Sequence, residues 1–62
     1  MIRFVRLRDA SSKCETMVNP DKVQLLEDAS DNSGPKVRII FGPGQSMLVD
    51  GRLDDVVRQL RD

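Results

Sequence analysis

The sequence predicts an α+β fold: a small five-stranded, mainly antiparallel meander or partly open barrel, followed by one C-terminal helix. Three observations support this prediction. Short segments of β-branched and aromatic residues alternate with polar residues along most of the chain. Turn-forming residues separate these segments at short intervals. Near the C-terminal end, apolar residues recur at helical spacing, at Leu53, Val56, Val57 and Leu60.

The 62 residues are expected to form one domain, residues 1–62, with a marginal core. A chain of this length buries only about 60% of its unfolded surface, so small domains usually need disulfides, a metal or a partner subunit. One cysteine, Cys14, and no histidine argue against a disulfide framework and a structural metal. No cofactor is predicted, and association into a homo-oligomer is the expected source of additional stability.

The overall charge is balanced, with ten basic and ten acidic residues. This balance provides no general attraction to nucleic acid or to an anionic membrane, although a local patch is compatible with it. No apolar run approaches the roughly 20 residues of a membrane span, and the first residues lack the apolar core of a signal peptide. A soluble cytoplasmic protein is therefore expected, in agreement with the single cysteine.

The first strand is expected at residues 2–7, where the alternation of apolar and polar residues breaks at Phe4 and Val5. Two explanations remain open. A bulge exchanges the two faces of the strand, or the strand has apolar neighbours on both faces, as at a subunit interface. The second explanation makes Phe4, Val5 and Leu7 the predicted interface residues, although the protein partner itself is unknown.

A second strand is expected at residues 13–18, after a polar loop at residues 9–12. Its period of two places Cys14, Thr16 and Val18 on one face, and Cys14 is interpreted as a small core residue. Residues 19–22, with the sequence Asn-Pro-Asp-Lys, then predict a turn or a single helical turn capped by the asparagine.

The middle of the chain predicts two strands separated by a long loop. Val23, Leu25 and Leu26 indicate a third strand that ends at Glu27 and Asp28. Residues 29–35 are expected to be a mobile, solvated hairpin tip without chemical function.

The fourth and fifth strands are expected at residues 36–41 and 45–49. The sequence around each lysine gives no indication that its side chain is buried. The intervening turn matches type II geometry, with Pro43 at its second position and Gly44 at its third.

A short helix is expected after residues 50–51, which provide its cap. Asp54 and Asp55 in the first turn and Arg58 and Arg61 in the last complement the helix dipole. Asp54 and Arg58 are also spaced for an i,i+4 ion pair. A helix of about ten residues is barely stable alone, so its apolar stripe must dock on the sheet or on a partner.

No residue pattern predicts an enzyme. Without histidine, Cys14 or a serine has no imidazole base to activate it. The acidic pairs at residues 27–28 and 54–55 are interpreted as a strand end and a helix start, because adjacent side chains diverge. Residues 42–46 lack the features of a phosphate-binding loop and are interpreted as a hairpin turn.

The basic residues of the first strand are the one local charge asymmetry. Arg6 and Arg8 share one face of an extended strand and Arg3 lies on the other. With Arg38 on a neighbouring strand, they are candidates for contact with nucleic acid or another partner. The alternative is a solvated face that discourages edge pairing, which the lack of interleaved aromatic residues favours; only Phe4 and Phe41 are aromatic.

The order of these segments resembles that of the small FlbD/SwrD-type flagellar and swarming-motility proteins. The resemblance rests on a Met-Ile-x-hydrophobic-x-basic-Leu opening, an Asn-Pro-Asp turn, a hairpin and a short Val-rich helix. It covers residues 1–7, 18–23, 26–27, 37–41, 45–49 and 53–60. It implies a non-enzymatic accessory role, with no catalytic residues to carry over.

A second resemblance is to the carbon storage regulators, RNA-binding dimers built from five strands and a C-terminal helix. They begin with a similar alternating segment ending in arginine and pass directly from a Val-rich strand into a helix. The resemblance implies that Arg6 and Arg52 are the matching basic positions. A small RNA- or DNA-binding regulator that uses the arginines of the first strand is the alternative to an interaction protein.

Overall fold

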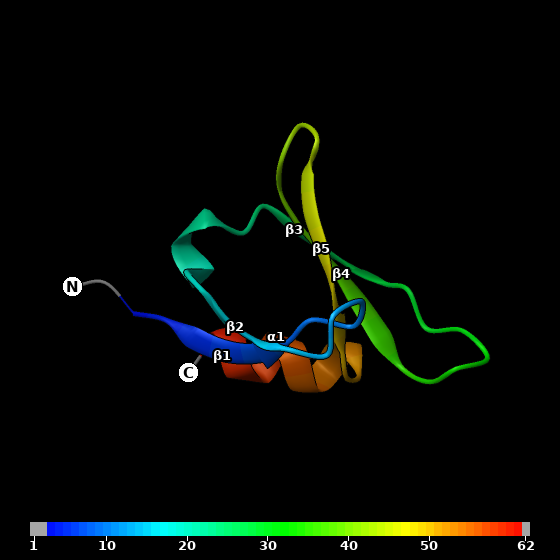
Figure 1. Cartoon of the computed structure of the whole chain (residues 1–62). Coiled ribbons are helices and arrows are strands. Elements are labelled where there is room, and N and C mark those ends of the chain that lie inside the picture. Colours follow the sequence, from blue (N-terminus) through cyan, green and yellow to red (C-terminus); the bar gives the residue numbers. More distant parts are fainter. Residues whose placement is uncertain (1–2, 62) are drawn as a thin grey trace.

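The computed structural model describes residues 3–61, and in this range it has five antiparallel strands and one α-helix (Figure 1). The predicted α+β meander is confirmed, and the strands form two sheets rather than a closed barrel. The elements are β1 (Val5–Arg8), β2 (Glu15–Val18), the 3-10 turn η1 (Pro20–Lys22), β3 (Leu25–Asp28), β4 (Lys36–Gly42), β5 (Gln45–Asp50) and α1 (Leu53–Arg61).

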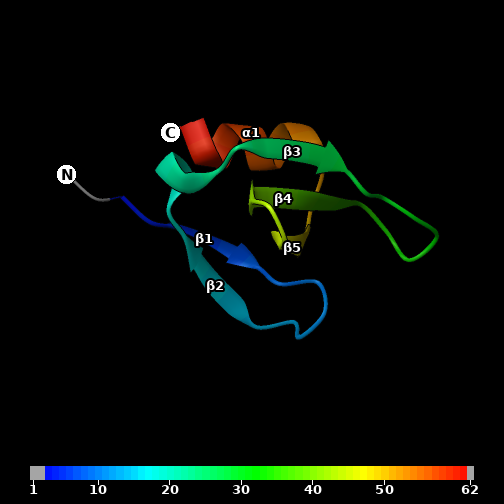
Figure 2. The ribbon, with the colours of Figure 1, turned by 90° about the horizontal axis from the view of Figure 1, so that it is seen from above.

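The two sheets are the β1-β2 hairpin and the β3-β4-β5 meander. They are joined where the chain leaves β1, because Asp9 forms an antiparallel bridge with Val49 of β5. The Ala10 amide also donates to the Leu48 carbonyl oxygen, at 2.8 Å. From one end to the other, the strands therefore follow the order β2-β1-β5-β4-β3 (Figure 2).

The core lies between the β3-β4-β5 sheet, the β1-β2 hairpin and α1. Alternate residues of each strand point into this space, as the period of two requires. Figure 2 shows α1 beside β3 and β4, which it contacts. The central cluster consists of Leu7, Val18, Val37, Ile39, Val49 and Val56, all nearly inaccessible to solvent.

The first strand begins later than predicted, at Val5, and Ile2 lies outside the described residues. Val5 is partly buried and Leu7 is fully buried, while Arg6 and Arg8 are exposed. The register with β2 is continuous from Val5 to Arg8, so the strand contains no bulge. The break in the sequence pattern has a simpler cause: Phe4 is an apolar residue on the exposed face.

The predicted position of Cys14 in the core is wrong. The second strand starts at Glu15, not at residue 13, and Cys14 is exposed. Lys13 has a left-handed backbone, with φ of 63°, which an extended strand does not accommodate. The turn therefore ends immediately before Cys14, beyond the region where β2 covers the core.

Two turns follow the predicted chemistry. In η1, the Asn19 side chain accepts a hydrogen bond from the Asp21 amide at 3.0 Å, and Pro20 occupies the first helical position. In the β4-β5 hairpin, Gly44 has φ of 70°, as the third position of a type II turn requires.

The loop at residues 29–35 is hydrogen-bonded and covers a buried lysine. Lys36 is only 9% exposed, although nothing in its sequence setting marks it as a buried lysine. Its Nζ lies 3.0 Å from Asp31 Oδ1 and also donates to Ser33 Oγ. Hydrogen bonds from Ser33, together with Lys36, lower the pKa of Asp31 to about 2. The loop folds over the lysine because these short polar side chains supply partners for its charge.

Helix α1 docks on the sheet, as predicted, with Val56 only 1% exposed. Its ion pairing differs from the prediction, since Arg58 lies 3.7 Å from Asp55 rather than pairing with Asp54. Asp50, predicted to cap the helix, instead holds Lys13 at 3.1 Å. No helix in residues 3–61 is long and apolar enough to cross a membrane.

Candidate interaction surface on the first hairpin

The side of the β1-β2 hairpin that points away from the core is the candidate functional surface. We call it the hairpin outer face. Its side chains come from alternate positions of the two strands and from the residue before β1, and all of them are exposed. The hairpin outer face consists of Phe4, Arg6, Arg8, Glu15 and Met17.

The register of the hairpin fixes the neighbours on this face. Arg6 is directly opposite Met17, and Arg8 is directly opposite Glu15. The observed ion pair is diagonal, with Arg6 Nε 3.4 Å from Glu15 Oε2. Diagonal neighbours across an antiparallel pair are within reach of long side chains. The ion pair shows which diagonal the twist of this hairpin brings together.

The same diagonal relates Phe4 to Met17. Extending the register by one residue beyond Val5 and Val18 sets Phe4 opposite Asn19, two residues after Met17. Phe4 is 54% exposed and Met17 is 53% exposed. The end of the hairpin outer face near the start of β1 therefore carries the apolar pair of Phe4 and Met17. The rest of this face carries the charged residues Arg6, Arg8 and Glu15.

The four predicted contact arginines do not converge on one surface. Arg3 donates to the main-chain carbonyl oxygen of Leu60, near the C-terminal end of α1, where a cation complements the helix dipole. Arg38 lies on β4, and its Nη1 is 3.9 Å from Glu27 Oε1. Only Arg6 and Arg8 belong to the hairpin outer face, and Arg6 is paired with Glu15.

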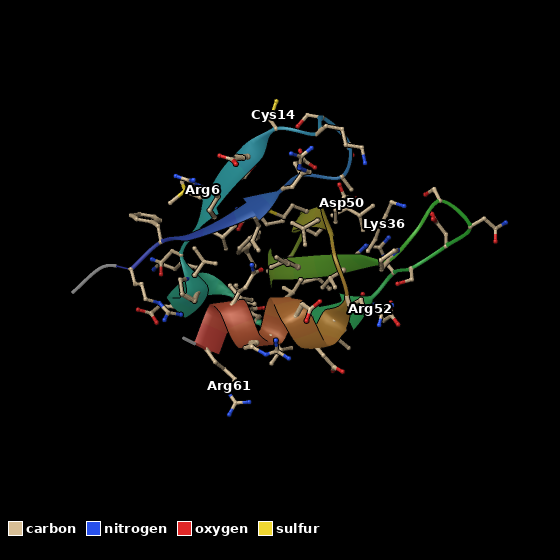
Figure 3. All side chains as sticks on the ribbon, turned by 90° about the horizontal axis from the view of Figure 1, so that it is seen from below. Arg6, Cys14, Lys36, Asp50, Arg52 and Arg61 are labelled. Atoms are coloured by element: carbon tan, nitrogen blue, oxygen red, sulfur yellow. The ribbon has the colours of Figure 1, made fainter. Side chains whose placement is uncertain are left out.

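Arg8 is the less neutralised of the two arginines on the hairpin outer face. Among the residues that the structure describes, it has no carboxylate within 4.0 Å. Arg52, the second basic position implied by the carbon storage regulators, lies before α1 at a distance from Arg6 (Figure 3). Apart from Arg6 and Arg8, which share β1, these arginines thus lie on different elements and do not extend this pair into a longer basic stripe.

The predicted interface residues separate into different environments. Leu7 is 5% exposed and belongs to the core of the chain, so it provides no free surface. Val5 is partly buried against that core. Phe4 remains available, and Met17, which the sequence interpretation did not select, lies beside it. The sequence does contain an indication that Met17 is exposed: successive residues of a strand point to opposite faces, so Met17 points away from the face that carries Thr16 and Val18.

A shallow hollow elsewhere on the surface has a mixed lining. It lies between the loop after β3 and the start of α1. Its lining consists of three charged residues, Asp28, Arg52 and Asp54, and three uncharged residues, Ser30, Pro35 and Leu53. Hydrogen bonds from Ser30 lower the pKa of Asp28. With two carboxylates against one guanidinium in its lining, this hollow is unsuited to an anionic ligand.

Within residues 3–61, Cys14 and the carboxylates form no recognisable metal centre. Cys14 projects from the hairpin near its turn, away from Lys36 and Arg52 (Figure 3). In the part of the chain that the structure describes, no three potential metal ligands are grouped together.

Comparison of the chain with protein-family models, with curated proteins and with solved structures finds no match.

Proposed function

We propose that this chain is a non-enzymatic interaction protein that associates with further copies of itself. The observation that supports the proposal is the exposed apolar pair of Phe4 and Met17 on the hairpin outer face. Burying such side chains is favourable by about 25 cal/mol per Å² of apolar surface. The small core of a 62-residue chain also favours self-association, because association stabilises domains that are only marginally stable alone.

The chemistry of the sequence supports the non-enzymatic part of the proposal. A chain without histidine has no imidazole for general acid–base catalysis near neutral pH. The resemblance to FlbD/SwrD-type proteins implies the same class of function. The single cysteine favours a reducing compartment, and we place the protein in the cytoplasm on this ground.

The test of self-association is the molar mass in solution as a function of concentration. Sedimentation velocity or light scattering from about 1 µM to about 1 mM covers the range expected for a small interface. We expect the average mass to rise with concentration. A monomer throughout this range would refute the proposal.

A small RNA- or DNA-binding regulator is the second candidate, and the exposed pair Arg6 and Arg8 is the observation that favours it. Two phosphate contacts give a slope of log affinity against log salt of about −1.8. Binding should therefore fall roughly tenfold between about 50 and 200 mM salt. Anisotropy of a labelled oligonucleotide measures this slope, and no binding at the lower salt concentration would exclude this candidate.

A further inference from the structure

The described strands end at two open edges. In the order β2-β1-β5-β4-β3, β2 and β3 each have a neighbour on one side. An unpaired edge offers free main-chain donors and acceptors to another strand. The two edges differ in how they are protected, and that difference identifies the surface through which the proposed self-association occurs.

Strand β3 carries its own protection. Its last two residues, Glu27 and Asp28, are both acidic and exposed, and charged residues on an edge discourage pairing with another strand. Helix α1 also contacts β3. Strand β2 is less protected: Glu15 is its only charged residue, and that carboxylate is paired with Arg6.

The main chain of β2 is oriented to accept a further strand. The Asp9 amide donates to the Cys14 carbonyl oxygen at 2.9 Å, which continues the β1-β2 register by one residue. Hydrogen-bonded pairs alternate with non-hydrogen-bonded pairs along an antiparallel ladder. Thr16 and Val18 therefore bond to β1, whereas Glu15 and Met17 direct their amides and carbonyls to the open edge.

We infer that β2 pairs antiparallel with β2 of a second copy about a two-fold axis at Met17. This inference rests on the proposed self-association and specifies its surface. In this register Met17 lies opposite Met17 of the second copy, and the two residues exchange both main-chain hydrogen bonds. The apolar pairs of the two hairpin outer faces then form one strip across the axis.

Other registers are less favourable. A shift by one residue turns core-facing side chains outward, so only registers that preserve the faces need consideration. An axis at Glu15 sets Met17 opposite Lys13, whose left-handed backbone, with φ of 63°, interrupts the extended strand. An axis at Thr16 sets Glu15 against Met17, and an axis at Val18 runs into Pro20 of η1, which has no amide hydrogen.

Cysteine substitutions along the edge test this register. In a Cys14→Ser background, Met17→Cys brings the two sulfur-bearing residues to a Cα separation of about 5.5 Å, within the range of about 4.4–6.8 Å that disulfides require. We expect mild oxidation to produce a cross-linked dimer on a non-reducing gel.

Glu15→Cys in the same background is the matched control, because Glu15 lies on the same face and edge. Its two copies are four residues apart along the strands, about 13 Å, and should not cross-link. Preferential cross-linking of Glu15→Cys or Thr16→Cys would overturn the register at Met17.

A second pair of variants tests the edge without cross-linking. Met17→Lys introduces a charge at the axis and should weaken association at least tenfold in sedimentation experiments. Leu25→Lys removes an equally exposed apolar residue, 51% against 53%, from the other edge strand and should leave association unchanged. Circular dichroism checks that both variants are folded.

The outcomes separate this inference from the proposal on which it rests. Self-association that is insensitive to Met17→Lys, without a cross-link through Met17→Cys, overturns the β2 edge and leaves self-association intact. A monomeric wild type overturns both.

Discussion

The sharpest prediction about stability concerns Val56, the residue through which α1 joins the core. Val56 is 1% exposed, whereas its neighbour Val57 is partly exposed. Val56→Ala removes two methyl groups from the buried cluster. At about 0.8 kcal/mol per buried CH₂, with a further cost for the cavity, the expected loss in the free energy of unfolding is about 2 kcal/mol.

This loss is large for so small a chain. A typical stability of about 0.05–0.15 kcal/mol per residue gives a total of about 3–9 kcal/mol for 62 residues. A loss of about 2 kcal/mol therefore lowers the melting temperature by roughly 10 °C. Because the chain has no tryptophan or tyrosine, unfolding is best followed by far-ultraviolet circular dichroism in urea, at several protein concentrations to separate folding from association.

Val57→Ala is the matched control for this experiment. Both substitutions replace valine with alanine in the same helix, so the gain in helix propensity, roughly 0.5 kcal/mol, is the same in both. We expect Val57→Ala to cost at least about 1 kcal/mol less than Val56→Ala, because its methyl groups are already partly hydrated. Equal losses in the two variants would mean that α1 is not held through Val56.

Three further predictions concern polar and backbone features. The pKa of Asp31 is lowered to about 2 from 3.8, so its contribution to stability is present above about pH 4 and is lost as the pH falls toward 2. The urea midpoint of Asp31→Asn should therefore change less than that of the wild type between pH 5 and 2, and parallel pH profiles would contradict this. Lys13 has φ of 63°, a backbone conformation that asparagine tolerates and β-branched residues do not. Lys13→Val should therefore be about 1 kcal/mol less stable than Lys13→Asn in urea unfolding. Equal stability of the two variants would argue against the left-handed turn. Gly44 has φ of 70° and no heavy atom within 4 Å of an added Cβ. Gly44→Ala should therefore lower the free energy of unfolding by about 1 kcal/mol through the backbone alone, and Gly44→Asn should lower it less. The shift in the thermal midpoint measures both losses.

Local chemistry was sufficient to predict most of the fold. The Asn19 cap with Pro20 and the Pro43-Gly44 turn use residues whose conformational preferences are strong and short in range. The stripe containing Val56 follows the helical period. The helix ion pair was misassigned because Asp54 and Asp55 are both within reach of Arg58, and only the rotamers decide between i+3 and i+4.

Features that depend on long-range placement were harder to predict. The burial of Lys36 requires the loop at residues 29–35 to fold over it, which no periodicity reveals. Cys14 has the correct parity for the core but lies beyond the end of β2. Only part of the candidate surface was predicted from the sequence. Phe4 was selected correctly as an exposed residue, whereas Leu7 is buried in the core. Met17 was identified only from its position opposite Arg6 in the hairpin register.

The contact between Arg3 and the Leu60 carbonyl oxygen has a consequence for how the chain folds. These residues are 57 positions apart, and the bridge between Asp9 and Val49 also joins an early segment to a late one. Contacts of such separation form only after a large loop has closed, which slows folding. A growing chain can form the β1-β2 hairpin early, but the apolar side of that hairpin remains uncovered until β5 and α1 have been synthesised.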